Sequence, residues 1–263
     1  MRSSEGTDVP RRASLLVARL RGLFVVLRRQ ARTVLQDPAT LKRLFQRRYW
    51  RELRHQTSAV DHGSWSASPT GVHRRVYQTY DDYLDHQRSK LELMDLAAYD
   101  TVYRDALRYR LEGSGFDVRA KAVLCLAARI GTEVKAFADL GSFAVGVDLN
   151  PGPHNLYVLP GDFHELQFPE ACVDIVFTNS LDHALEPERL AAEVHRVLKP
   201  GGVVILELSD LVEQVSDAQW ETFAWADHEV VLELFTRLGF AECHRVPIDV
   251  PATHDLFVIL QKP

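Results

Sequence analysis

Asp148 stands at a position where a carboxylate could bind a nucleoside. It follows the apolar run AVGV and lies 17 residues after Gly131. A carboxylate at the end of a second strand can accept hydrogen bonds from both hydroxyls of a ribose. The alternative is an Asp that caps a helix or organises a loop. The spacing favours the ribose role.

The next two apolar runs also end in polar residues. After LYVLP come Asp162, which could accept a hydrogen bond from an adenine amino group, and Phe163, which could cover a ring face. After VDIVF comes TNSLDH, residues 178–183, in which five of six side chains are polar. A structural joint needs only one or two polar residues, so this segment is expected to face a ligand.

His183, at the end of TNSLDH, is the best candidate for a general base. An unperturbed histidine pKa near 6.5 suits proton transfer at neutral pH. Asp182 could orient His183 or act itself, and His183 could instead only pack against a cofactor. His164 has a weaker case for the same role.

A mainly parallel sheet is the element that would bring these positions together. From Lys121 onward, short runs rich in Val, Ile and Leu alternate with helical stretches, which predicts a sheet covered on both faces. Ligands bind beyond the carboxyl ends of such strands. The predicted strands are AVLCLA, AVGVDL, LYVLPGD, VDIVFTNS, VVILELS, AECHRVPI and HDLFVILQ, and helices are expected from Thr132, over about 187–198 and over about 217–238.

Two further segments precede the sheet. Residues 57–71 are rich in Ser, Thr, Gly and Pro and predict a linker or loop. Residues 72–112 show a helical pattern that ends at Gly113 and Gly115, and they are expected to cap the ligand site. Four polar or aromatic residues of this cap are expected on the helix surface, namely Tyr80, Tyr83, His86 and Gln87.

The segment VLCLAARIGTE, residues 123–133, has the pattern of a strand that ends in a turn and opens a helix, where nucleotides usually dock. Together with GVDLN, GDFHELQFPEACVDIVFTNSLDH and RVLKPGGVVILEL, it resembles the motifs of class I S-adenosylmethionine-dependent methyltransferases. The resemblance implies a doubly wound α/β fold with a seven-stranded sheet whose last pair is antiparallel. It also implies S-adenosylmethionine as cofactor.

The resemblance assigns site residues as well. It implies a catalytic pair, His183 and Asp182, and no metal ligands. The cofactor-binding residues that it implies are Ala127, Arg129, Gly131, Glu133, Asp148, Leu149, Asp162, Phe163, Asn179 and Ser180.

The first motif departs from the family pattern. The family usually has an acidic residue where Cys125 stands and glycines where Ala127 and Arg129 stand. S-adenosylmethionine carries no phosphate, so the loop need not cradle an anion with bare backbone. Arg129 could bind the methionine carboxylate through two parallel hydrogen bonds, and Glu133 could face the ammonium. The alternative is a loop that has lost its ligand and an Arg129 that is a solvated surface charge.

A second departure lies between the second and third predicted strands. Residues 150–161 are too few for the usual helix, and Pro151-Gly152-Pro153 excludes regular helix. An extended connection is expected there.

Composition sets wider limits. The 263 residues, 46% hydrophobic and 25% charged, predict one large α/β domain with an appendage. The domain is expected over residues 72–263, with its sheet core in 120–263. The cysteines, Cys125, Cys172 and Cys243, are too widely separated for metal spacing or a disulfide framework, which favours a cytoplasmic location.

Residues 1–56 differ from the rest in charge. They hold 14 Lys and Arg against 4 Asp and Glu, a net charge of +10, whereas the remainder carries −15. Leu16, Leu20, Leu23 and Leu27 predict an amphipathic helix. Its apolar stripe needs a cover: the protein's own domain, a second copy in a homodimer, or an anionic membrane in peripheral contact. We expect protein rather than membrane, because the apolar face is short.

These observations predict methyl transfer from S-adenosylmethionine to a small-molecule, sugar or lipid-linked acceptor, on oxygen. A non-catalytic binding protein on the same scaffold is the alternative. A nicotinamide oxidoreductase is disfavoured because G-x-G-x-x-G is absent. The acidic charge of residues 57–263 disfavours a nucleic acid acceptor, although the basic charge of residues 1–56 leaves that alternative open.

Overall fold

The computed structural model describes residues 64–67, 71–89, 96–152, 154–209, 220–249 and 254–263. All of them belong to one compact unit, formed by Ser64–Glu213 and Trp220–Pro263. The second unit, residues 1–63 and 214–219, lies outside the described residues. The expectations for residues 1–56, an amphipathic helix with a membrane or dimer contact, therefore fall outside the description too.

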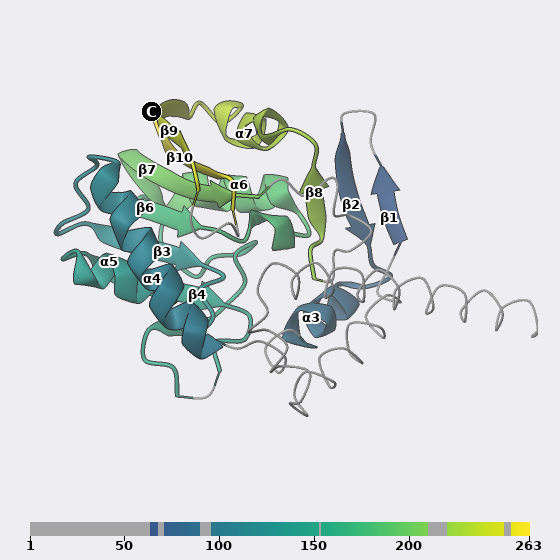
Figure 1. Ribbon diagram of the computed structural model, residues 1–263. Coiled ribbons are helices and arrows are strands. Elements are labelled where there is room, and N and C mark those ends of the chain that lie inside the picture. Colours follow the sequence, from purple (N-terminus) through teal and green to yellow (C-terminus); the bar gives the residue numbers. More distant parts are fainter. Residues whose placement is uncertain (1–63, 68–70, 90–95, 153, 210–219, 250–253) are drawn as a thin grey trace, which may run out of the picture. The chain divides into compact units, whose positions relative to one another are not determined.

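A seven-stranded sheet forms the centre of the described unit (Figure 1). Its strand order is β5-β4-β3-β6-β7-β10-β9. The first five strands in this order are parallel, and β10 runs antiparallel to both of its neighbours, β7 and β9. This confirms the predicted fold. The strands are β3 (Ala122–Leu126), β4 (Phe143–Asp148), β5 (Val158–Pro160), β6 (Val173–Thr178), β7 (Leu198–Leu208), β9 (Ala241–Pro247) and β10 (Leu256–Gln261).

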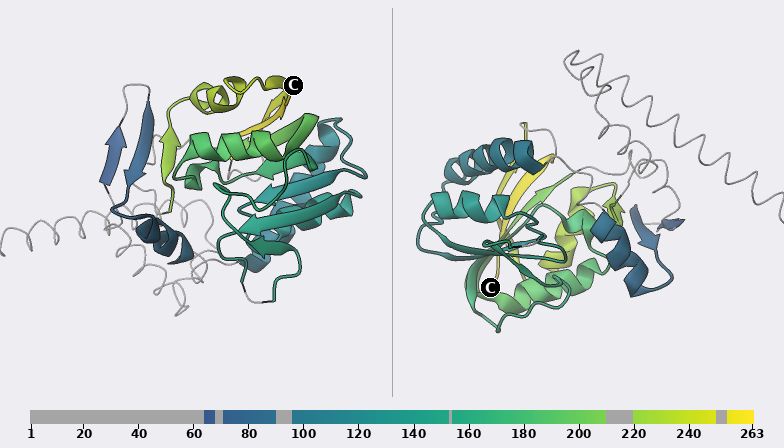
Figure 2. Two further views of the ribbon diagram at one scale, coloured as in Figure 1. Left: turned by 180° about the vertical axis from the view of Figure 1, so that it is seen from behind. Right: turned by 90° about the horizontal axis from the view of Figure 1, so that it is seen from below.

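Helices cover both faces of this sheet. In the view from below, α4 (Leu96–Gly113) and α5 (Thr132–Asp139) lie on one side and α6 (Pro187–Val197) on the other (Figure 2). From β3 the chain moves outward to β4 and β5, and it then returns to build β6 and β7 on the opposite side. Right-handed crossovers therefore place α5 and α6 on opposite faces. The crevice for a ligand is expected where this direction reverses, next to β3.

The core lies between the sheet and the pair α4 and α5. Alternate residues of four strands face it, as the two-residue period of a strand requires. Leu107, Leu111 and Phe137 from the helices pack against them, and each is fully buried. The inward strand residues are Val123, Cys125, Ile175, Phe177, Val203, Ile205, Phe257 and Ile259.

A second, three-stranded antiparallel sheet was not predicted. It has the order β1-β2-β8, formed by β1 (Ser64–Ala67), β2 (Val72–Val76) and β8 (Phe223–Trp225). The sequence predicted loop at 64–67, helix from 72 onward and helix across 223–225. Phe223 and Trp225 are buried, so pairing with β2 outweighs the local helical pattern.

Two further helices belong to the described unit. Helix α3 (Tyr80–Ser89) follows β2, and α7 (His228–Thr236) begins where the Asp227 side chain accepts a hydrogen bond from the Glu229 backbone N–H at 3.0 Å. Between β4 and β5, residues 149–152 and 154–157 form no helix. Among the described helices, none has the length and apolar character to cross a membrane.

Candidate cofactor pocket and active site

A cleft with an empty volume of about 470 Å³, part of it open to solvent, lies at the carboxyl ends of β3, β4 and β6. Its walls come from α3 and from the segments that follow four successive strands. The lining residues are Tyr83, Gln87, Ala127, Arg129, Asp148, Leu149, Asn150, Phe163, Ser180 and His183.

Seven of the residues predicted for the site line this cleft. They come from separate segments of the sequence and are Ala127, Arg129, Asp148, Leu149, Phe163, Ser180 and His183. The other predicted residues are not among those that line the cleft: Gly131, Glu133, Asp162, Asn179 and Asp182. Tyr83, Gln87 and Asn150 also line the cleft but were not predicted for it.

The loop after β3 has the backbone conformation of a glycine-rich loop, although only one of its three left-handed residues is a glycine. Ala127, Arg129 and Gly131 have φ values of +53°, +43° and +81°, so alternate residues are left-handed. A left-handed residue other than glycine costs roughly 1–2 kcal/mol. At Gly131 a Cβ atom would lie 2.6 Å from the Tyr157 Cβ, which explains why this glycine remains.

Asp148 connects this loop to the end of β4. Its Oδ2 accepts the Arg129 backbone N–H at 3.0 Å, and its Oδ1 accepts the Asn150 backbone N–H at 2.7 Å. Each carboxylate oxygen has a second lone-pair direction, so these bonds leave acceptor capacity for two hydroxyl groups. Asp148 can therefore organise the loop, as the alternative interpretation held, and bind a ribose at the same time.

Asn155 fixes the loop from the other side. Its amide Nδ2 donates to the carbonyls of Arg129 at 2.8 Å and Pro151 at 2.7 Å, while its Oδ1 accepts the backbone N–H groups of Tyr157 and Val158. One side chain thus ties the first loop to the connection between β4 and β5. An Asn in a Pro- and Gly-rich segment was the only sequence signal for this role.

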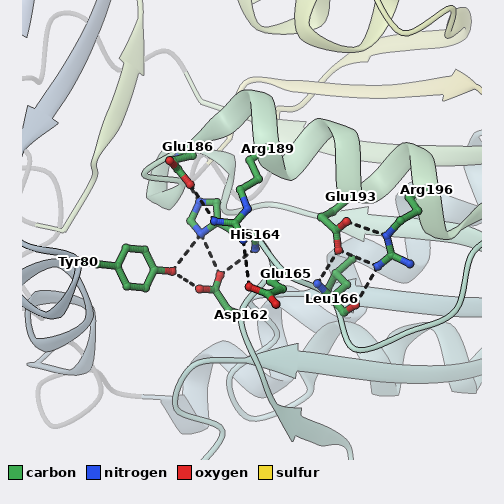
Figure 3. A network of polar contacts seen from close by, with 9 residues as sticks. All are labelled: Tyr80, Asp162, His164, Glu165, Leu166, Glu186, Arg189, Glu193 and Arg196. Carbon is green, nitrogen blue, oxygen red and sulfur yellow. Dashed lines mark hydrogen bonds and ion pairs between the residues drawn. The ribbon is translucent and has the colours of Figure 1, made fainter.

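Asp162 holds the next wall in a polar cluster (Figure 3). Its carboxylate accepts hydrogen bonds from the Tyr80 hydroxyl, the His164 backbone N–H and His164 Nδ1, the last at 2.9 Å. Burial opposes the charged form, but hydrogen bonds from His164 and Tyr80 outweigh it and lower the pKa of Asp162. The carboxylate is therefore ionised and already bonded to protein groups.

His164 is a structural residue in this cluster. Its Nε2 accepts the Glu186 backbone N–H at 3.1 Å, so the ring proton is on Nδ1 and points to Asp162. With both nitrogens bonded, His164 positions the neighbouring Phe163, whose ring centroid lies 4.7 Å from its own. Phe163 then forms part of the cleft wall.

Ion pairs join this wall to α6 (Figure 3). Arg189 contacts Glu165 at 3.0 Å and Glu186 at 3.2 Å. Further along, Glu193 accepts the Leu166 backbone N–H at 2.7 Å, and Arg196 donates to the Leu166 carbonyl at 2.8 Å. The segment after β5 is thereby fixed along the length of α6.

A buried polar cluster lies behind the first loop. Asn179 Nδ2 donates to the hydroxyls of Tyr99 at 3.0 Å and Tyr103 at 2.7 Å, and Tyr99 donates to Glu133 Oε1 at 2.9 Å. Tyr103 in turn donates to Glu207 Oε2 at 2.6 Å. These bonds connect α4 with the ends of β6 and β7.

Glu133 is the unusual member of this cluster. Its side chain is buried and its Oε2 has no hydrogen-bond partner among the described residues. Burial raises the pKa of Glu133 to about 7, although the hydrogen bond from Tyr99 and the charge of Arg129 lower it. A buried carboxylate oxygen without a partner indicates a place for a cationic or hydrogen-bonding ligand.

His183 lies at the end of the short 3-10 helix η3 (Leu181–His183) and lines the cleft. Its Nδ1 lies 3.0 Å from the Trp220 carbonyl oxygen, which can only accept, so Nδ1 carries a proton. In the neutral ring, Nε2 is then the basic nitrogen. Asp182 Oδ2 lies 3.8 Å from this Nε2.

Comparison with known proteins identifies the class. Residues 124–206 match the family model of the methyltransferase domain. This match confirms, for residues 124–206, the predicted resemblance to class I S-adenosylmethionine-dependent methyltransferases. S-adenosylmethionine is the cofactor of this class.

Two curated relatives and one solved structure show how far the similarity extends. A malonyl-[acyl-carrier protein] O-methyltransferase from Marinomonas sp. (strain MWYL1) is 29% identical over 134 residues, covering 50% of this chain and 47% of that protein. An uncharacterized methyltransferase from Mycobacteroides abscessus is 29% identical over 111 residues, covering 36% and 42%. The chain thus spans less than half the length of these relatives.

The solved structure confirms the fold. It is Burkholderia thailandensis 1,6-didemethyltoxoflavin-N1-methyltransferase with bound 1,6-didemethyltoxoflavin and S-adenosylhomocysteine. It matches with a TM-score of 0.55 at 17% identity, over 76% of this chain and 99% of that one.

Proposed function

We propose that this protein transfers a methyl group from S-adenosylmethionine to an oxygen atom of a small-molecule, sugar or lipid-linked acceptor. The observation that carries the proposal is the cleft itself. It gathers Asp148, Phe163 and His183 from the ends of three different strands, together with the loop after β3. These are the groups needed for a ribose, a purine ring and a proton.

The side chains present fit the cofactor. Asp148 would accept hydrogen bonds from the ribose hydroxyls, and Leu149 and Phe163 would contact the adenine. Arg129, which lines the cleft, would bind the methionine carboxylate. Glu133 Oε2, which has no hydrogen-bond partner among the described residues, would accept the ammonium. The positive charge of that ammonium would keep Glu133 ionised despite its burial. When bound, S-adenosylmethionine supplies the reactive methyl group.

His183 would act as the general base. Its Nε2 would take the proton of the acceptor hydroxyl, and bound S-adenosylmethionine would give up its methyl group to that oxygen and leave as S-adenosylhomocysteine. The Asp182 carboxylate, 3.8 Å from Nε2, stabilises the positive charge that His183 acquires. Much of the rate would come from holding the acceptor oxygen in line with the methyl group.

The cofactor proposal predicts the effect of Asp148→Ala. Calorimetry with S-adenosylmethionine on the full chain should show binding that this substitution weakens by roughly 1–3 kcal/mol, the cost of leaving polar groups unpaired. Asp148→Asn keeps the shape of the side chain and one acceptor oxygen, so the loss of affinity should be smaller. Asp105→Ala, at an exposed position on α4, is the control.

Unchanged affinity in a folded Asp148→Ala variant would remove Asp148 from the ribose site. No binding to the unmodified chain would overturn the cofactor assignment as a whole.

A non-catalytic binding protein is the second candidate. The observation that favours it is the altered first motif, with Cys125 in place of an acid and left-handed Ala127 and Arg129. Incubation with methyl-labelled S-adenosylmethionine and pooled metabolites separates the two functions. Transfer of the label to a metabolite supports the enzyme if His183→Ala abolishes that transfer. Binding of S-adenosylmethionine without transfer supports the non-catalytic protein.

A further inference from the structure

One face of α3 is bonded to three segments around the cleft. Tyr80, Tyr83 and Gln87 are spaced by three and four residues and share that face. Tyr80 donates to the Asp162 carboxylate, Tyr83 to the His183 carbonyl at 3.1 Å, and Gln87 Nε2 to the Trp220 carbonyl at 2.7 Å. The sequence placed these residues on the helix surface. That placement is wrong for Tyr83 and also for His86, each of which is only 1% exposed.

Two of these bonds converge on His183. Tyr83 holds its backbone carbonyl, and Gln87 bonds the same Trp220 carbonyl oxygen that accepts His183 Nδ1. A carbonyl oxygen has two lone pairs, so it can accept both donors at once. Gln87 thereby fixes the position of the oxygen that determines the His183 tautomer.

The small sheet holds the same region from its other side. The Thr222 backbone N–H donates to the Asp182 carbonyl at 2.7 Å, and the Arg75 backbone N–H donates to the Thr222 carbonyl at 2.8 Å. Since Trp220 lies two residues before Thr222, the small sheet and α3 fix its carbonyl oxygen together. This gives the unpredicted sheet a role in the site.

We propose that Gln87 is a positioning residue for His183. Through the Trp220 carbonyl it keeps the ring proton on Nδ1 and leaves Nε2 to receive the proton of the acceptor. This rests on the proposed function in taking His183 as the general base. Gln87 also lines the cleft, so α3 both covers the proposed cofactor site and positions the proposed general base.

The chemical reason is the weak intrinsic preference between the two tautomers. Free histidine favours the proton on Nε2, the form that could not act as a base toward the cleft. The bond to Trp220 reverses that preference, and it does so only while the carbonyl points at Nδ1.

Long-range proton–nitrogen NMR of the labelled full chain measures this tautomer directly. His183 signals are assigned by their absence in His183→Gln. In the unmodified protein we expect the Nδ1–H form. In Gln87→Met, which keeps the length and removes the donor, the tautomer ratio should shift toward Nε2–H by roughly five-fold, the scale of one net hydrogen bond.

Tyr80→Phe is the matched control. It removes one hydrogen bond from the same face of α3, but its partner Asp162 does not contact His183 in the bonds described. A merely structural loosening of α3 would change the His183 tautomer ratio by the same amount in both variants. If Gln87→Met does not fold, Gln87→Leu also removes the donor without adding an acceptor, and the same shift toward Nε2–H is expected.

An unchanged tautomer ratio in the Gln87 variant, or an equal shift in Tyr80→Phe, overturns the proposal. The cofactor assignment fails separately, through calorimetry on the unmodified chain, because the His183 tautomer is measurable without any ligand.

Discussion

Ala127 and Arg129 occupy backbone positions that glycine would fill at lower cost. Their φ values of +53° and +43° repeat the geometry of a glycine-containing loop. Hydrogen bonds of Asp148 and Asn155 to the Arg129 backbone hold that geometry against its strain. The side chains that these substitutions add can thus point into the cleft without a change in loop shape.

This strain predicts that Ala127→Gly stabilises the protein. Relief of roughly 1–2 kcal/mol of left-handed strain exceeds the roughly 0.5–1 kcal/mol entropic cost of a new glycine. We expect a net gain of about 0.5–1 kcal/mol in the free energy of unfolding, measured by urea titration.

The neighbouring Ala128 is the control. It is 1% exposed and is not left-handed, so Ala128→Gly should destabilise. Equal losses in both variants would contradict the strain argument.

At the scale of the element, α7 depends on its cap. Asp227 has extended backbone and its Oδ1 accepts the Glu229 N–H at 3.0 Å. Asp227→Ala should lower the free energy of unfolding by about 1 kcal/mol, the usual value of an N-cap. Asp227→Asn keeps an acceptor oxygen and should restore most of it. If the Asn variant loses as much as the Ala variant, the cap is not the source of the stability.

The same scale explains what the sequence could predict. Asp148 and the segment 178–183 were assigned to the site because they directly follow buried strands, and strand ends of a parallel sheet converge. Strands β2 and β8 were missed because they are short and their pairing joins residues about 150 positions apart. Tyr83 and Gln87 were missed because composition does not show which face of a polar helix is buried.

At the scale of the whole molecule, a chain of buried polar groups connects elements that are distant in sequence. It runs from Glu133 through Tyr99, Asn179 and Tyr103 to Glu207, where Arg110 Nε donates at 2.7 Å. The Glu207 carboxylate is therefore paired with the guanidinium of Arg110. Glu133 lies at the other end of this chain, with one oxygen lacking a partner in the described structure. Its burial was beyond sequence reasoning because the contacts with α4 create it.

The raised pKa of Glu133 predicts how stability changes with pH. Its folded pKa is about 7, above the ordinary value of 4.5, so the folded protein binds a proton that the unfolded chain has lost. The resulting stability is fully present below about pH 4.5 and declines as the pH rises through 7. Relative to Glu133→Gln, the protein should lose on the order of 3 kcal/mol between these limits.

Urea titrations from pH 3 to pH 8 measure this difference, and Glu193→Gln provides a control of opposite sign. The hydrogen bond from Arg196 lowers the pKa of Glu193, so that carboxylate contributes stability above its unfolded pKa and loses it on acidification. The advantage of the unmodified protein should therefore shrink with rising pH against Glu133→Gln, and shrink with falling pH against Glu193→Gln. Parallel curves for the unmodified protein and Glu133→Gln would show that Glu133 is already ionised in the folded state, which would require a cation beside it without any ligand.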